Sequence, residues 1–243
     1  MTDRTRSRDR DDVGLPDPPW RSPRRPLRRR ITREGIVDAA AVVLDRDGAD
    51  AVTARAVAEQ MGTGPASLYA HVDGKNELLE LLVDRVIGEM AVPEEASAER
   101  WTDQLRQMCH DTRTVLLAHP GIAKVALAGP PSGPNALRRT ESLLGVLRTG
   151  GLSDQVAGLA VDLLSLFVVS SAYEADVRRS AVAASETDWP AKLEGYFAAL
   201  PPHYPNIIDL AAELTRPSEV ERFEFGLDVL IGGIRALGHS ADG

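Results

Sequence analysis

The sequence TARAVAEQMG at residues 53–62 is followed two residues later by PASLYAH at residues 65–71. Thr53 has the side chain of a helix N-cap, and Gly62 is suited to the end of a helix. Pro65 is suited to the first turn of a second short helix, because the N–H that proline lacks has no helical partner there. Two short helices joined by a tight turn predict a helix-turn-helix, whose second helix enters the major groove of DNA.

Longer helices are expected on both sides of this pair. One begins after Thr32 and stops at Gly48, and the other begins at Asp73 and ends before Pro93. Each carries apolar residues at helical spacing, so each has one face to bury. The segment 31–90 is therefore expected to form one helical domain.

Three segments of this domain carry a family resemblance. They are Thr53–Gly62, Ser67–Val72 with a Leu-Tyr-x-His pattern, and Lys75–Leu79 with a Lys-x-Glu-Leu-Leu pattern. On these residues, 32–90 resembles the N-terminal domain of the TetR family of bacterial transcriptional repressors. The rest of the chain is similar to the C-terminal domain of tetracycline repressors, through His119–Gly121, Gly133–Asn135 and Gly150–Ser153. The resemblance implies a DNA-binding repressor that a small molecule releases from its operator.

Beyond residue 90 the sequence predicts only helices, because apolar residues recur at helical spacing and strand-like alternation is absent. The expected helices lie near 97–118, 135–150, 154–180 and 218–238, with shorter ones near 190–200 and 206–215. The expected fold class is all-α. It combines an N-terminal three-helix helix-turn-helix DNA-binding domain at 31–90 with a C-terminal helical ligand-binding and dimerisation domain at 91–243.

Residues 1–30 are expected to form a disordered basic arm, since no helical or strand period is present in them. They hold ten arginines and five aspartates, whereas the whole chain has a net charge of −8. The segment 31–90 has eleven acidic and five basic residues, so its carboxylates are expected to face away from DNA. Arg28, Arg29 and Arg30 are candidates for contact with the DNA minor groove, and a solubilising tail is the alternative.

Eight further residues are candidate DNA contacts. Lys75 would lie in the first turn of a helix, where a cation opposes the helix dipole, so a bound phosphate would explain its position. Tyr69 and His71 lie close to Leu68, the expected core residue, and should project toward the DNA backbone. Ser67 can reach a base edge. In the alternative interpretation, Thr53 and Ser67 only cap helices. The full set is Thr53, Arg55, Pro65, Ala66, Ser67, Tyr69, His71 and Lys75.

The predicted helices 154–180 and 218–238 have more apolar surface than one helix face holds. They indicate a four-helix bundle between two copies of the chain, as the resemblance also implies, and burial within one chain is the alternative. The candidate dimerisation residues are Leu159, Leu163, Phe167, Phe223, Leu227, Leu230 and Ile234. A homodimer reads two half-sites, so the expected partner is a palindromic double-stranded DNA operator.

Helix 97–118 mixes apolar and polar residues on one side, as the lining of a ligand pocket does, and ordinary core is the alternative. The candidate ligand-binding residues are Trp101, Leu105, Met108, Cys109, Thr112, Leu116, Phe167 and Glu174. Tetracycline-binding relatives place a metal-ligating histidine where this chain has Ala126, which argues against magnesium-tetracycline as the ligand. Glu174 matches a pocket carboxylate of those relatives. No metal or other cofactor is expected.

Enzyme and membrane classes have little support in the sequence. The phosphate-binding loop, the serine-hydrolase elbow, the zinc-peptidase helix and the di-iron motif are absent. No run of 18 apolar residues and no secretion signal are present, so we expect a soluble, cytoplasmic protein that spans no membrane. The alternatives are a small-molecule sensor or adaptor that does not act through DNA and, behind it, a helical-bundle enzyme.

Overall fold

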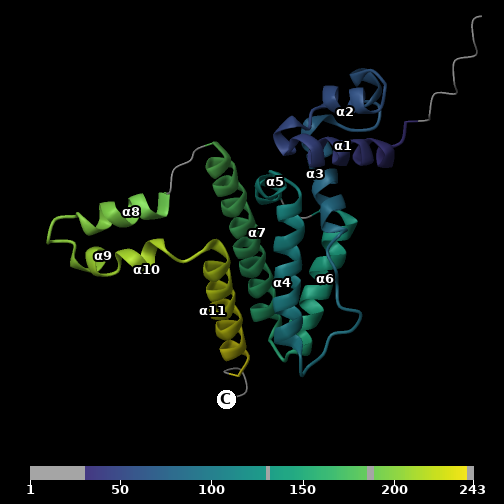
Figure 1. The fold of residues 1–243 in the computed structure, drawn as a ribbon. Coiled ribbons are helices and arrows are strands. Elements are labelled where there is room, and N and C mark those ends of the chain that lie inside the picture. The colour runs from purple at the N-terminus through teal and green to yellow at the C-terminus, as the bar shows by residue number, and fades with distance from the viewer. Residues whose placement is uncertain (1–30, 130–131, 185–188, 240–243) are drawn as a thin grey trace, which may run out of the picture. The chain divides into compact units, whose positions relative to one another are not determined.

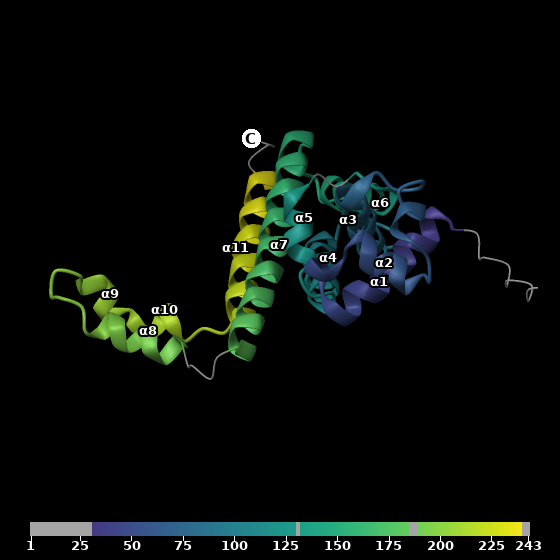
Figure 2. The same cartoon turned by 90° about the horizontal axis from the view of Figure 1, so that it is seen from above.

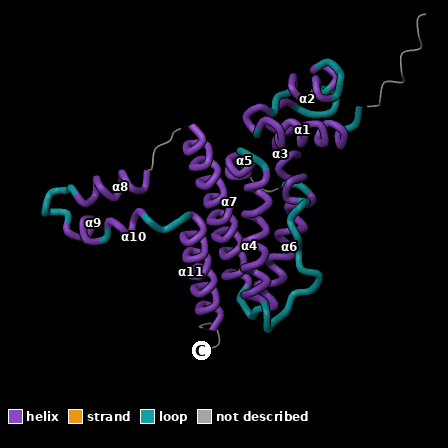
Figure 3. The backbone as a smooth tube through the Cα atoms, in the orientation of Figure 1, coloured by secondary structure: helices purple, strands orange, loops and turns teal. Residues whose placement is uncertain are grey.

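The computed structural model describes residues 31–129, 132–184 and 189–239. Every regular element in these ranges is a helix, which confirms the all-α prediction (Figures 1 and 3). The N-terminal elements are α1 (Arg33–Asp47), η1 (Ala49–Ala51), α2 (Ala54–Gln60), η2 (Pro65–Ser67) and α3 (Gly74–Ile87).

Threonine side chains cap α1 and α2 as the sequence predicts. Thr32 Oγ1 accepts a hydrogen bond from Gly35 N at 3.1 Å, and Thr53 Oγ1 accepts one from Ala56 N at 3.1 Å. Each bond satisfies a backbone donor that has no partner within its helix. The helices are held together by fully buried residues, among them Ile36, Leu44, Val57, Leu68 and Leu82.

The second helix of the motif is tighter than the sequence predicts. Residues 65–71 form the 3₁₀ turn η2 and then further turns, in which His71 N and Val72 N both donate to Leu68 O. Gly74, with φ of 84°, redirects the chain into α3. Because so few residues separate the proline from this glycine, the segment completes mostly i→i+3 turns, with one i→i+4 bond from Val72 N, rather than a regular α-helix.

The C-terminal helices agree with the sequence prediction except in two places. The sequence analysis missed α5, a seven-residue helix. It also expected one helix near 206–215, where the structure has two that meet at Leu210. The elements are α4 (Trp101–Ala118), α5 (Ile122–Ala128), α6 (Pro134–Thr149), α7 (Asp154–Ala184), α8 (Trp189–Ala198), α9 (Pro205–Asp209), α10 (Ala211–Thr215) and α11 (Glu219–His239).

The C-terminal core lies between α4, α6, α7 and α11. Helices α7 and α11 lie side by side (Figures 1 and 2), and they are antiparallel, since Leu152 contacts Gly238 while Glu174 binds Arg222. Each of the four helices contributes fully buried apolar residues, among them Leu105, Leu147, Leu164 and Leu227. The short helices α8, α9 and α10 pack on one another.

The turn between α4 and α5 connects the N-terminal helices to this core. The buried imidazole of His119 has Nδ1 2.7 Å from Asp45 Oδ1 on α1 and Nε2 3.0 Å from Glu89 Oε2 just after α3. Next to it, Pro120 O accepts a hydrogen bond from Ala49 N at 2.9 Å. The N-terminal helices are therefore tied to the core by ion pairs and by a backbone hydrogen bond.

Candidate nucleic-acid interface and effector cavity

The turn that contains η2 separates a core anchor from an exposed surface. Leu68 is 2% exposed, while its neighbour Tyr69 is 60% exposed. Ser67 is half-buried, and the other residues predicted to contact DNA in the described part of the chain are exposed: Thr53, Arg55, Pro65, Ala66, Tyr69, His71 and Lys75. These side chains come from the starts of α2 and α3 and from the turn between them.

Lys75 lies in the first turn of α3. It forms no ion pair within the described part of the chain, so its ammonium is free to meet a phosphate. The side chain of Asp73 makes no cap bond, while the Glu77 carboxylate accepts a hydrogen bond from Asp73 N. Thr53 does cap α2, and a capping role leaves its exposed side open for contact as well.

Several carboxylates of the N-terminal helices bind the C-terminal core. Asp45 and Glu89 face His119, and Asp50 lies 3.4 Å from Lys124 Nζ. Such contacts agree with the expectation that these acidic groups face away from the DNA. Arg28, Arg29 and Arg30, predicted to enter the minor groove, lie outside the described residues, so their contact with DNA stays a prediction.

A cavity of about 530 Å³ lies between α3, α4, α5, α6 and α7. Its volume is within the range of roughly 300–1,000 Å³ that is typical of small-molecule sites. Four of the residues predicted to bind ligand line it, namely Met108, Cys109, Thr112 and Leu116. Burial raises the pKa of the Cys109 thiol to about 11, so this cysteine is a neutral wall residue at physiological pH.

The other four predicted ligand-binding residues lie elsewhere. Trp101 and Leu105 are core residues, and the Trp101 ring packs against Gly150. They do not line this cavity, so their ligand-binding role stays a prediction. Phe167 and Glu174 line a separate small pocket near α11.

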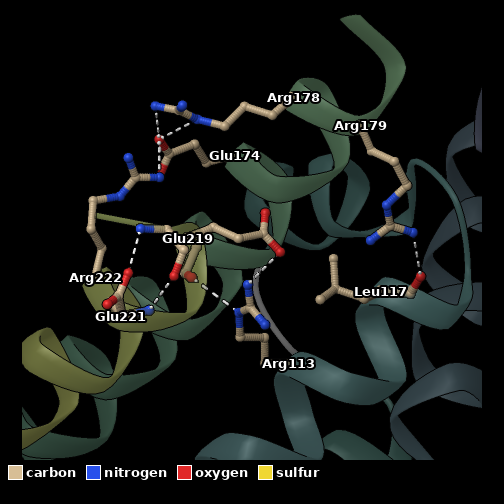
Figure 4. A network of polar contacts seen from close by, with 10 residues as sticks. Arg113, Leu117, Glu174, Arg178, Arg179, Glu219, Glu221 and Arg222 are labelled. Atoms are coloured by element: carbon tan, nitrogen blue, oxygen red, sulfur yellow. Dashed lines mark hydrogen bonds and ion pairs between the residues drawn. The ribbon is translucent and has the colours of Figure 1, made fainter. Parts of the chain in front are cut away.

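Glu174 belongs to a polar network that joins α4, α7 and α11 (Figure 4). Its carboxylate binds Arg178 at 2.8 Å and Arg222 at 3.1 Å. Close by, Arg113 lies 3.2 Å from Glu219 and stands over the ring of Phe223. These ion pairs offset the charge of the Glu174 carboxylate, and the ligand-binding role predicted for it stays a prediction.

Much of the cavity wall comes from elements that the sequence analysis did not assign to it. Helix α3 contributes Leu79, Val83 and Ile87, and α5 contributes a wall that includes Ala126. Helix α6 contributes Arg139 in the middle of an apolar stripe. A charged residue at an inward position of an amphipathic helix was a readable signal, whereas the α3 wall required the tertiary structure.

The residues predicted to join two copies differ in their exposure in the single chain. Phe223, Leu227 and Ile234 are at most 4% exposed and belong to the core of the single chain, which leaves little of them to contact a second copy. Phe167 and Leu230 are partly buried against the same core. Leu159 and Leu163 are exposed on α7, and the outer faces of α7 and α11 add Leu166, Val220, Phe225, Val229 and Leu237.

This exposed face also bears on the membrane prediction. By length and composition, Asp154–Ser180 is apolar enough to cross a membrane, contrary to the sequence-based expectation, and only 28% of its most apolar window is buried. Helix α7 nevertheless packs on α4, α5, α6 and α11, as the central helix of a core does. The outer face of α7 is the part of this helix that remains exposed in the single chain.

Both halves of the chain match known protein families. Residues 36–82 match "Bacterial regulatory proteins, tetR family", and residues 92–237 match "Tetracyclin repressor-like, C-terminal domain". The transcriptional repressor DrrR1 of Streptomyces coeruleorubidus is 30% identical over 228 residues, which cover 90% of this chain and 83% of DrrR1. The class D tetracycline repressor of Escherichia coli is 28% identical over 208 residues, which cover 84% and 89% of the two chains.

Solved structures show the same similarity in three dimensions. Apo ActR from Streptomyces coelicolor superposes with a TM-score of 0.79 at 38% identity, covering 87% of this chain and 98% of ActR. ActR in complex with actinorhodin gives a TM-score of 0.78 at 39% identity, covering 85% and 97%. The chain therefore belongs to the TetR family of bacterial transcriptional regulators, as a ligand-responsive DNA-binding repressor.

Proposed function

We propose that this repressor binds a palindromic operator as a homodimer and releases it when a small organic molecule enters the cavity between α3 and α7. The main support for the proposal is that α3 contributes both to the predicted DNA-contacting surface and to the cavity wall. This helix carries the exposed Lys75 in its first turn and places Leu79, Val83 and Ile87 in the cavity wall. A molecule in the cavity therefore touches the helix that holds the DNA-facing turn.

The spacing of two recognition elements is the property that such contact would change. In a helix-turn-helix dimer the two elements lie about 34 Å apart to reach successive major grooves. A displacement of α3 alters this spacing, and an effector that prefers the altered state by about 1–3 kcal/mol lowers the affinity for DNA by roughly 5- to 150-fold. The ActR structures with actinorhodin and with (S)-DNPA support a small organic molecule as the effector here.

The exposed faces of α7 and α11 supply the proposed dimer interface. Leu159, Leu163, Phe225 and Val229 are each more than 40% exposed in the single chain, and water-exposed apolar area of this kind favours association. A Cβ atom added at Gly158, Gly232 or Gly233 would meet nothing within 4 Å, so these positions are open to a second backbone. We place the protein in the cytoplasm, where DNA and effector meet.

The domain division at residue 90 and the role of the arm belong to the same proposal. Residues 31–90 hold the DNA-facing turn, residues 91–243 hold most of the cavity and the dimer faces, and Arg28, Arg29 and Arg30 reach the minor groove. The arm would add the positive charge that the acidic segment 31–90 lacks.

A gel-shift experiment with the DNA upstream of the protein's own gene tests the proposal. A specific shift that survives excess unrelated DNA, with two half-sites protected from nuclease, is the expected result. A sensor or adaptor that does not act through DNA would give no specific shift, and this outcome would contradict the proposed function. The same assay with cell extracts as a source of effector should show release of the DNA.

A further inference from the structure

The charged residues that line the cavity differ in their exposure to solvent and in their hydrogen-bond partners. Arg139 is the only cationic residue among the described residues that line it. Three carboxylates line it as well, but Glu80 and Asp162 are exposed to solvent. The third, Asp84, caps the start of α6, where it accepts hydrogen bonds from Ala136 N at 2.9 Å and Asn135 Nδ2 at 3.1 Å. The inner charged group that is left for a ligand is therefore the Arg139 guanidinium.

Arg139 binds only neutral acceptors. Its Nη1 donates to Ala91 O at 2.7 Å, and its Nη2 donates to Met108 O at 2.5 Å and to Thr112 Oγ1 at 2.6 Å. No carboxylate forms an ion pair with it in the part of the chain that the structure describes. Withdrawing a cation from water without an ion-pair partner is unfavourable, and burial lowers the pKa of the guanidinium from its ordinary value although the more distant charge of Asp111 acts in the opposite direction.

The guanidinium also has hydrogen-bonding capacity to spare. It carries five N–H groups in a planar fork, and three of them are used by the acceptors above. The Nε–H has no acceptor among the described residues, and none of their side-chain nitrogens is buried without a partner, so this N–H is accessible beside the cavity. A carboxylate can accept a charge-assisted hydrogen bond from it.

The rest of the cavity is apolar. Its inner walls include Leu79 and Val83 from α3, Leu116 from α4, and Leu164 and Val168 from α7. Such walls favour a hydrophobic body on the ligand, and the single buried cation favours an anionic group at one place on it. A neutral ligand would leave the Arg139 guanidinium without an ion-pair partner.

We propose that the effector is an aromatic or alicyclic carboxylic acid whose carboxylate binds Arg139 while its apolar body contacts α3 and α7. This inference rests on the proposed function, in which the cavity holds the effector. The alternative role of Arg139 is a brace that only ties α6 to α4 through Met108 O and Thr112 Oγ1. A brace affects acids and their neutral analogues equally, which separates the two roles.

The test uses two probes of nearly identical shape, anthraquinone-2-carboxylate and anthraquinone-2-carboxamide. Titration calorimetry measures the binding of each probe to the full chain and to three variants. Arg139→Met removes the charge, Arg139→Lys keeps it, and Arg138→Met changes the exposed neighbour as a matched control. Thermal unfolding of every variant checks that it is folded at the temperature of the titration.

We expect the carboxylate to bind the unmodified chain at least tenfold more tightly than the carboxamide, because hydrogen bonds between charged groups are worth about 10- to 150-fold in affinity. Arg139→Met should abolish this preference and leave the weaker carboxamide binding within about threefold, as expected when only one charge–charge contact is lost. Arg139→Lys should retain a preference for the acid, and Arg138→Met should behave as the unmodified chain does.

Equal binding of acid and amide, or an acid preference that survives Arg139→Met, would overturn the inference and identify Arg139 as a brace. Binding of neither probe would also overturn it, because the cavity would then not accept a flat hydrophobic acid. A gel shift on the same preparation distinguishes these outcomes from a failure of the proposed function. In each of them the chain still binds its operator, whereas failure of the proposed function removes operator binding itself.

Discussion

Leu68 and Tyr69 are neighbours in the sequence, yet one is buried and the other is exposed. The buried leucine fixes the turn against the N-terminal core, and this contact determines the direction in which the tyrosine points. At the start of α3 the Glu77 carboxylate accepts a hydrogen bond from Asp73 N, while Lys75 stays exposed. Single contacts of this kind shape the surface that is predicted to contact DNA.

The residues of this surface should differ in what they contribute to binding. Lys75→Ala and Tyr69→Phe should weaken binding to every DNA sequence, because phosphate contacts position the protein without reading bases. Lys75→Ala should also reduce the slope of log affinity against log salt by about 0.9. Ser67→Ala should instead change which operator sequence is preferred. Gel shifts on a set of operator variants measure all three.

A matched control for the lysine is Lys192→Ala, an exposed lysine of α8 that should leave DNA binding unchanged. If Ser67→Ala weakens binding to all sequences by the same factor, its assignment to base readout is wrong.

His119 should make the stability of the protein depend on pH. Burial lowers the pKa of its imidazole, but hydrogen bonds to Glu89 and Asp45 and the attraction of their charges outweigh burial and raise it above its ordinary value. Only the imidazolium donates from both ring nitrogens, so the protonated form is the one that bridges the two carboxylates. This contribution is complete below the ordinary pKa of about 6.5 and is lost as the pH rises through the raised pKa.

His119→Gln should therefore destabilise the protein by roughly 1.5–3 kcal/mol near pH 6 and by less near pH 9. Urea unfolding of both proteins at the two pH values measures the difference. The control is His203→Gln at an exposed histidine, which should show no comparable pH-dependent loss. A loss of stability that is the same at both pH values would contradict the charged bridge.

At the scale of elements, helix ends and glycines determine how closely neighbours pack. The start of α6 is held by Asp84 of α3, and its end lies against the indole of Trp101 on α4. A Cβ atom added at Gly150 would lie 2.5 Å from Trp101 Cδ2, whereas one added at Gly145 on the same helix would meet nothing within 4 Å. A side chain at position 150 would therefore clash with Trp101, whereas position 145 has room for one.

Gly150→Ala should destabilise the fold by about 1–3 kcal/mol, because the buried indole has to move in a packed core. Gly145→Ala serves as the control and should be neutral or stabilise the fold by up to about 1 kcal/mol, since alanine favours a helix interior. Denaturant unfolding measures both changes. Equal effects of the two substitutions would show that contact with Trp101 is not the reason for Gly150.

At the scale of the whole molecule, we expect the outer faces of α7 and α11 to form the dimer interface. Sedimentation of the full chain at micromolar concentration should give about twice the chain mass of 26.2 kDa. The double substitution Leu163→Glu with Val229→Glu should produce monomers, because it places four carboxylates in one apolar interface. Leu137→Glu changes an equally exposed leucine on α6 and should leave the dimer intact.

If the unmodified chain sediments as a monomer, the proposed dimer interface is wrong. The apolar outer face of α7 would then have to be covered by another partner. A membrane-bound chain is one such outcome, since the same helix is long and apolar enough to span a bilayer. Fractionation of cells that express the protein separates that case from a soluble dimer.

The sequence by itself determined the local features of this protein. Helical spacing of apolar residues, threonine caps at 32 and 53, and glycine or proline at the breaks predict most of the helices, because these signals act over a few residues. The exposed set from Thr53 to Lys75 was also readable, since a short motif fixes which side chains face outward. The seven-residue α5 escaped because it is too short to show a clear period.

Only the tertiary structure decided which face of a long helix meets which neighbour. Trp101 and Thr112 lie on one helix, yet one belongs to the core and the other to the cavity. Phe223 and Phe225 differ in the same way on α11, where one is buried in the chain and the other is exposed. Helix α3 lies far in the sequence from the other helices that line the cavity. The hydrogen-bond partners of His119 and Arg139 are likewise distant from them in the sequence. A helical period carries no information about which element packs against the helix.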